Sequence, residues 1–195
     1  MYEKLSGRKM NFLPHLLEKS EVIKLPEAQR KWDIYFIGFN NPFNVEGLKW
    51  FLDDVYPYLD KNLRIVLVGS ATKAIECNYS NVDIIPFAPD LDEIYKNVKV
   101  AICPMFQGTG MKIKVVEAMA NGLPVVCNER GVDGFPDKTK CGCLVTQDAK
   151  QFADYCNELS KNQDFYNQCA ETIEHYFNEL FDLNRYELLI KKVFD

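Results

Sequence analysis

The residues best suited to chemistry lie in one segment, QGTGMKIKVVE, at positions 107–117. Gly108 and Gly110 precede a helical pattern, and glycine lets a backbone come close to a phosphate. Free backbone N–H groups at a helix start, together with the helix dipole, favour an anion. Lys112 adds a cation to the segment and Glu117 adds a carboxylate. The segment is therefore a candidate anion-binding site.

The same spacing also fits a purely structural interpretation. Gly108 and Gly110 suit a tight turn between a strand and a helix. Lys112 and Lys114 suit solvated helix positions, and Glu117 stands three residues after Lys114, where an ion pair can form. Position 113, where the dinucleotide fingerprint needs a third glycine, holds isoleucine, and no Gly-Lys-Ser/Thr phosphate loop occurs. Spacing alone leaves both interpretations open.

Strand-like and helix-like patterns alternate along the chain and must position this segment. Apolar runs predict strands at 33–39, 64–70, 82–87, 98–103, 124–127 and 142–146. Helical patterns cover 45–59, 89–97, 110–121, 149–161, 164–177 and 184–194. Asp90 and Glu93 form a capping-box pattern for the second of these helices. The alternation predicts a Rossmann-like three-layer α/β/α sandwich with a parallel sheet of about six strands and a helical carboxyl-terminal tail.

A sheet of this kind binds ligands beyond the carboxyl ends of its strands, at the topological switch point. Asn40 and Asn44 follow the first predicted strand, and Phe87 follows the third. Gly108 and Thr109 follow the fourth. We expect these loops to meet at one edge of the sheet.

The composition is that of an ordinary globular chain of 195 residues with a formal net charge of −5. No basic cluster is present to hold a phosphate backbone, which argues against nucleic-acid binding. The sequence contains no apolar run of about 18 residues and no signal-peptide pattern, so we expect a cytoplasmic protein. Its 7 cysteines are irregularly spaced and its histidines number 2, which predicts reduced thiols without disulfides or metal.

Three stretches carry a resemblance to a known family; in chain order they are GFNNPFNVEGLKWF, RIVLVGS and PMFQGTGMKIKVVEAMANGLPVV. Their order resembles the carboxyl-terminal domain of GT-B glycosyltransferases, in particular the retaining family 4, or glycosyl transferases group 1. EAMANGLPVV is the most specific piece, and CNERGVDGF and GCLV continue it in register. The resemblance runs from about Asn11 to about Phe181. It implies a domain that binds a nucleotide-sugar donor, while a separate amino-terminal domain holds the acceptor.

The resemblance also implies roles for individual residues. Glu117 would accept hydrogen bonds from the two ribose hydroxyls, and Lys112 would add a cation to the leaving diphosphate. Lys112 is expected to matter more than Lys114, which lies further along the helix. Phe87 and its neighbours would line the base, and no metal or other cofactor is implied. The expected substrate-binding residues are Asn40, Asn44, Phe87, Gly108, Thr109, Gly110, Lys112 and Glu117.

The sequence departs from the family pattern at two places. The family carries two glutamates eight positions apart, and the first of them falls on Thr109. The arginine and lysine that follow the first strand in many members fall near Phe39 and Glu46. These departures leave the donor sugar and the catalytic residues unassigned.

We expect residues 1–195 to form a single donor-binding domain, with residues 1–31 as a lead-in strand and connector. The acceptor domain is absent and would come from a partner chain or a longer protein, so this chain alone is expected to be an inactive part of a hexosyltransferase. Any peripheral membrane association would arise only through the missing half. Two alternatives remain: a non-catalytic Rossmann-like interaction module with a decayed site, and a fragment of a nucleotide-sugar epimerase.

Overall fold

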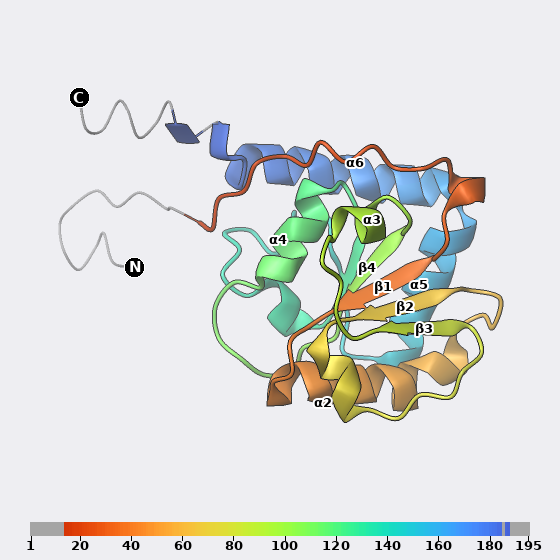
Figure 1. The fold of residues 1–195 in the computed structure, drawn as a ribbon. Helices are drawn as coiled ribbons and strands as arrows, with labels where there is room; N and C mark the ends of the chain where they lie inside the picture. The colour runs from red at the N-terminus through yellow and green to blue at the C-terminus, as the bar shows by residue number, and fades with distance from the viewer. Residues whose placement is uncertain (1–13, 185, 188–195) are drawn as a thin grey trace.

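A single parallel sheet organises the chain in the computed structural model, which describes residues 14–184 and 186–187 (Figure 1). The sheet has six strands in the order β3-β2-β1-β4-β5-β6. The pairings between neighbouring strands are all parallel, as predicted. In chain order the strands are β1 (Ile34–Ile37), β2 (Ile65–Val68), β3 (Val82–Ile85), β4 (Val100–Cys103), β5 (Val125–Cys127) and β6 (Leu144–Val145).

Helices cover both faces of the sheet and complete the predicted three-layer sandwich (Figure 1). One face packs against α2 (Pro42–Trp50) and α5 (Ala149–Lys161). The other packs against α3 (Asp92–Tyr95), α4 (Ile113–Ala120) and α6 (Gln163–Leu180). Side chains alternate across β1, so that Ile34 and Phe36 enter the first core and Tyr35 enters the second. Burial on both faces explains why the central strands are almost wholly apolar.

The first helix begins earlier than its apolar spacing predicts. Asn41 caps α2, its side chain accepting a hydrogen bond from the Asn44 backbone N–H at 2.9 Å, and Pro42 occupies the first helical position. The chain then continues through a π-helical turn, Phe51–Val55, and a 3-10 turn, Tyr56–Tyr58. The predicted helix is therefore real but irregular in its second half.

The predicted capping box before α3 is wrong. Leu91 precedes the helix, and the Asp90 carboxylate accepts a hydrogen bond from the Asp92 backbone N–H at 2.8 Å. Glu93 pairs instead with Lys96, at 2.8 Å. The Asp90 carboxylate thus accepts from Asp92, the first residue of α3, and not from Glu93, whose N–H a capping box would use.

The segment that precedes β1 runs as an extended connector beside α6 (Figure 1). Leu17 forms an isolated parallel bridge with Asp182. Further along, the Ser20 backbone N–H donates to the Ala120 carbonyl at 3.1 Å. Of the lead-in strand expected near residues 11–15, only 14 and 15 are described, and they carry no strand. The helix expected at 184–194 likewise lies mostly outside the described residues.

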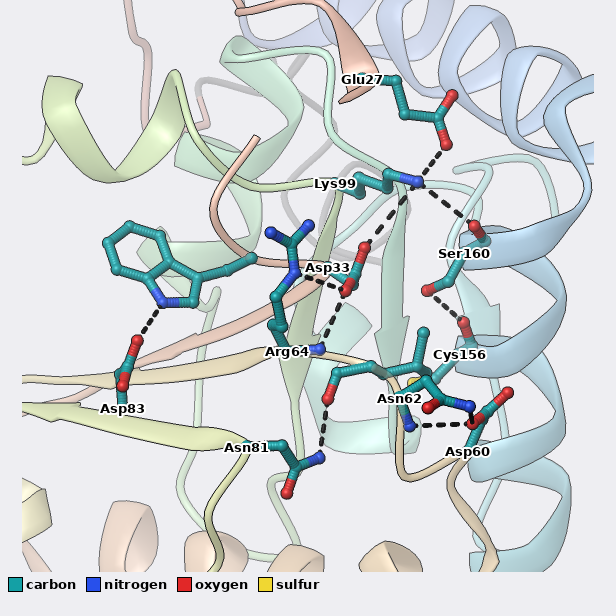
Figure 2. Close-up of polar contacts among 12 residues, drawn as sticks. Glu27, Asp33, Asp60, Asn62, Arg64, Asn81, Asp83, Lys99, Cys156 and Ser160 are labelled. Atoms are coloured by element: carbon teal, nitrogen blue, oxygen red, sulfur yellow. Dashed lines mark hydrogen bonds and ion pairs between the residues drawn. The ribbon is translucent and has the colours of Figure 1, made fainter. Parts of the chain in front are cut away.

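Charged side chains form ion pairs and hydrogen bonds at the amino edge of the sheet (Figure 2). Lys99 is only 7% exposed, forms an ion pair with Glu27 and lies 3.8 Å from an Asp33 oxygen. Its ammonium also donates to the Ser160 carbonyl at 3.3 Å. Asp33 in turn accepts a hydrogen bond from the Arg64 backbone N–H at 2.9 Å. One lysine thus ties the connector, β1 and α5 to the start of β4.

The seven cysteines are free thiols. Within the described ranges, no cluster of three or more His, Cys, Asp or Glu side chains is arranged to hold a metal ion. None of the helices in that part of the chain has the length and apolar character needed to cross a bilayer.

Candidate functional site

The candidate site lies where the strand order reverses, between β1 and β4. The loops that leave these two strands each open a helix, α2 after β1 and α4 after β4. Parallel strands direct both loops to the same edge, and both helix starts add a partial positive charge there. The sequence prediction that these loops meet at one edge is thus confirmed by the strand order.

The loop after β1 is built around Asn44, which is buried. The Asn44 side-chain N–H donates to the Phe39 carbonyl at 2.9 Å, and its Oδ1 accepts from the Lys114 ammonium at 2.7 Å. Asn40 is exposed, and its backbone N–H donates to Ser70 Oγ at 2.9 Å. Asn44 is therefore engaged within the protein, whereas the side chain of Asn40 faces solvent.

The loop after β4 uses its two glycines for backbone conformation. Gly108 has φ +91° and Gly110 has φ +77°, values that other residues rarely adopt. A side chain at Gly108 would also stand 3.5 Å from the Phe43 ring of α2, so the loop lies close against that helix. Gln107 adds a hydrogen bond to Glu46 of α2 at 3.2 Å. Thr109 and Gly110 are exposed at the tip of the loop.

The approach of α2 to the exit of β4 depends on one further glycine. A Cβ on Gly47 would stand 1.6 Å from the Pro104 carbonyl oxygen, which is far inside van der Waals contact. Only glycine permits this distance. Gly47 therefore allows α2 to hold the loop that contains Gly108 and Gly110.

Two lysines near the start of α4 have different surroundings. The Lys112 side chain is 8% exposed, and its ammonium donates to the carbonyls of Gly110 at 2.8 Å and Gly108 at 3.4 Å. Lys114 instead reaches across to Asn44 and lies over the Phe36 ring, 4.7 Å from its centroid. Burial lowers the pKa of Lys114, and the charge of Lys112 lowers it further. Lys112 thus closes its own loop, while Lys114 faces the end of β1.

Glu117 is half-buried one turn beyond the lysines. It forms no ion pair with Lys114 in the described structure, so the structural interpretation of their spacing does not hold. Burial raises the pKa of Glu117, against the lowering effect of the charges on His15 and Lys114. The buried hydroxyl of Tyr35 also has no hydrogen-bond partner in the described part of the molecule. Its pKa is raised by burial first, and the nearby Glu117 charge contributes.

Two other loops reach the same edge. Phe87 follows β3, two strands from the switch point, and its ring is 78% exposed. The loop after β5 comes close to the glycine loop, because a side chain at Gly134 would stand 3.2 Å from the Met111 nitrogen. The structure thus groups Asn44, Lys112 and the glycines closely, and leaves Phe87 further out along the edge.

Sequence reasoning missed the contacts that α2 makes with this edge. Phe43 and Glu46 hold the glycine loop, and Asn44 holds Lys114. The apolar spacing of α2 starts only at Val45 and gives no sign of these contacts. The Asn-Pro pair at positions 41 and 42 is a helix-start signal that would have placed Asn44 in the first turn.

The fold and this edge define a doubly wound, Rossmann-like domain of the kind that receives a ligand at its switch point. The family model of the glycosyl transferases group 1 matches residues 31–162, well over half of the sequence, and the chain belongs to that family.

One curated relative and many solved structures resemble the chain. The uncharacterised 44.6 kDa protein in the cps region of Klebsiella pneumoniae is 26% identical over 165 residues, covering 77% of this chain and 42% of that protein. The carboxyl-terminal domain of the group 1 glycosyltransferase LpcC of Francisella tularensis superposes with a TM-score of 0.61 at 14% identity, covering 79% of this chain and 88% of that one. HepE (Alr3699) of Anabaena, solved in complex with UDP-glucose, gives 0.66 at 16% identity, covering 86% and 49%.

At these identities the structural likeness establishes the fold. The chain spans less than half the length of the Klebsiella relative, and it matches nearly all of the excised LpcC domain. The predicted resemblance to the carboxyl-terminal domain of GT-B glycosyltransferases is therefore confirmed.

Proposed function

We propose that this chain is the donor-binding half of a glycosyltransferase and binds a nucleoside-diphosphate sugar at the carboxyl edge of β1 and β4. Membership of the glycosyl transferases group 1 supports this function. The single observation that carries it is the carboxylate of Glu117, half-buried on α4, the helix that follows the glycine loop, and free of an ion pair with Lys114. The UDP-glucose complex of the similarly folded HepE supports the same donor class.

In this proposal each element of the edge takes one part of the donor. Glu117 accepts hydrogen bonds from the vicinal ribose hydroxyls, which suit the two oxygens of a carboxylate. The start of α4, with Gly108 and Gly110 before it, presents backbone N–H groups to the diphosphate. The exposed ring of Phe87 lies where a base can stack on it, and Asn40 lies on the solvent side of the first loop.

Transfer of the sugar is proposed to need a second half of the enzyme. That half would hold the acceptor, and the reaction would occur between the two. Neither a metal ion nor another cofactor is required in this scheme, because lysine and backbone N–H groups offset the diphosphate charge. The transferred group is proposed to be a hexose.

The test is titration calorimetry of the chain with UDP, GDP and ADP and their sugars. The wild-type chain is expected to bind one of these nucleoside diphosphates. Glu117→Gln keeps the size of the side chain but loses its charge, and is expected to weaken that binding by about 1–3 kcal/mol. The melting temperature of unliganded Glu117→Gln is expected not to fall. Failure of the wild type to bind any nucleoside diphosphate at millimolar concentration would refute the function.

A second candidate is a non-catalytic interaction module. Thr109 favours it, because this exposed loop position carries no carboxylate toward a donor sugar. The same calorimetry separates the two functions, since an interaction module with a decayed site binds no nucleoside diphosphate.

A further inference from the structure

No carboxylate forms an ion pair with Lys114 in the described part of the chain, although the charge of Glu117 on the next turn of α4 raises the pKa of Lys114 against the lowering by burial. The other lysines with largely buried side chains have backbone or carboxylate acceptors: Lys99 has the carboxylates of Glu27 and Asp33, Lys112 has two backbone carbonyls, and Lys24 has the Gly122 carbonyl. Lys114 has only the amide oxygen of Asn44 and the face of the Phe36 ring. An ammonium that is withdrawn from water without a counterion lowers stability. A bound anion would supply the negative charge that the contacts of Lys114 lack.

The position of Lys114 matches that of an anion in a doubly wound sheet. Its ammonium reaches from α4 to Asn44 in the first turn of α2, and so spans the gap between the ends of β1 and β4. The N-terminus of α2 adds a partial positive charge at the same place. Glu46, the acidic residue nearest in sequence on α2, is turned toward Gln107 instead. The side chain and helix end that reach this point are therefore positive, and the nearest opposing charge is that of Glu117 on the next turn of α4.

Lys112 is the obvious competitor for the same role, and its contacts argue against it. The carbonyls of Gly108 and Gly110 both accept from its ammonium, and its side chain is buried. These bonds connect the two ends of the short turn that contains both positive-φ glycines. A phosphate that drew this ammonium outward would break both bonds and release the turn that they close.

We propose that Lys114, and not Lys112, is the side-chain cation that binds the diphosphate of the donor, with Asn44 as its positioning residue and Lys112 as a clasp of the glycine loop. This inference rests on the proposed function and adds to it the residue that recognises the diphosphate. Phe39 and Glu46 stand where the family resemblance implies cations. In this proposal the positive charge for the diphosphate comes instead from Lys114 on α4, on the opposite side of the switch point.

Calorimetry with matched ligands tests the assignment. The probes are the nucleoside diphosphate that binds the wild type and the corresponding nucleoside, which lacks phosphate. Lys114→Met is expected to weaken diphosphate binding about 10- to 100-fold, the effect of losing a charged hydrogen bond, and to leave nucleoside binding unchanged. Lys31→Met, at the exposed amino edge beside Trp32, makes the same charge change and is expected to alter neither. Lys112→Met is expected to lower the melting temperature and to weaken diphosphate binding less than Lys114→Met.

Asn44→Asp gives a second test that does not remove Lys114. A carboxylate in place of the amide oxygen provides Lys114 with a permanent counterion. The affinity for the diphosphate is then expected to fall at least as far as in Lys114→Met, with nucleoside binding unchanged. The melting temperature reports the balance between the new ion pair and the lost hydrogen bond from the Asn44 amide to the Phe39 carbonyl. A loss of diphosphate affinity alone in the folded variant is not expected of a residue with a merely structural role.

The outcomes separate this inference from the proposed function. If Lys114→Met and Asn44→Asp bind the diphosphate as tightly as the wild type while Glu117→Gln binds it weakly, the inference is overturned and the donor site stands. If Lys112→Met loses more affinity than Lys114→Met, the diphosphate cation is Lys112. If the wild type binds no nucleoside diphosphate, both proposals fail together.

Discussion

At the scale of single residues, Lys112 and Lys114 show that the direction of a side chain decides which groups it contacts. Successive positions along a helix start point to different sides, so that a shift of two residues turns a side chain from its own loop to the neighbouring helix. Lys112 precedes the first helical residue and folds back on Gly108 and Gly110. Lys114 lies in the first turn and reaches Asn44 of α2. Chemical type alone does not separate them, because both are lysines in one short segment.

The surroundings of Glu117 predict a pH dependence of donor binding. Burial raises the pKa of this carboxyl above the ordinary glutamate value of 4.5, although His15 and Lys114 oppose the rise. Since ribose hydroxyls donate to the ionised form, affinity for the nucleoside diphosphate is expected to fall as pH falls through that raised pKa. The loss is expected to begin at a higher pH than an exposed glutamate would give.

Calorimetry across the acidic to neutral range measures this effect. Glu117→Gln is the reference, because it retains the titration of the diphosphate itself and loses only the glutamate contribution. The groups that face Glu117 are His15, Lys114, Tyr35 and Tyr95. A wild-type profile parallel to that of Glu117→Gln, or one abolished by His15→Asn, contradicts the prediction.

At the scale of elements, the polar groups at the two edges of the sheet have different roles. The carboxyl edge carries the glycine loop and the helix starts, and its polar residues leave backbone and charge open to a ligand. The amino edge uses its charges against one another: Lys99, Glu27, Asp33 and Arg64 join the connector to β1, β2, β4 and α5 (Figure 2). In the proposed function, this division keeps the charge network that restrains the sheet at the edge away from the donor.

The Lys99 contacts predict a large and specific loss of stability. Lys99→Met is expected to lower the free energy of unfolding by about 3 kcal/mol, because Asp33 is then left buried with one partner fewer. Lys96→Met, which breaks the surface pair with Glu93, is expected to cost less than about 1 kcal/mol. Urea denaturation of both variants measures the difference. Equal losses would show that the Lys99 contacts add nothing beyond a surface pair, and a change in nucleoside diphosphate affinity in folded Lys99→Met would contradict the separation of the two edges.

At the scale of the whole molecule, the sequence predicted the fold well and the site only in part. The parallel order followed from apolar strands alternating with amphipathic helices, since each strand buries both faces. The glycine loop was predicted at the right edge because it stands between β4 and α4. The partners of the side chains that follow this loop were not predicted, because Lys114 contacts Asn44 only through packing between helices that are distant in the sequence. Irregular features, such as the π turn after α2 and the bend at Asp90, also lack a periodic signal.

The extent of the chain leads to the last prediction, which concerns catalysis. The chain spans 42% of the Klebsiella relative and matches 49% of HepE, and in the proposed function the acceptor is held by a second half of the enzyme. Apolar rings at the carboxyl edge are open to solvent, with Phe39 82% exposed and Phe87 78% exposed. A bound sugar at this edge would be surrounded by water, where the electrostatic stabilisation of a departing diphosphate is weak.

The chain alone is therefore expected to bind a nucleotide sugar without cleaving it. Incubation with UDP-glucose, GDP-mannose or ADP-glucose, followed by chromatography for the free nucleoside diphosphate, measures any release. We expect release at the rate of a buffer blank, while calorimetry on the same sample shows binding. Binding is also expected to be unchanged by a chelator, because lysine and backbone N–H groups hold the diphosphate in this proposal. Release well above the blank that disappears in Glu117→Gln would show that this half carries out the chemistry by itself, and loss of binding on chelation would require a metal ion that the proposed site does not use.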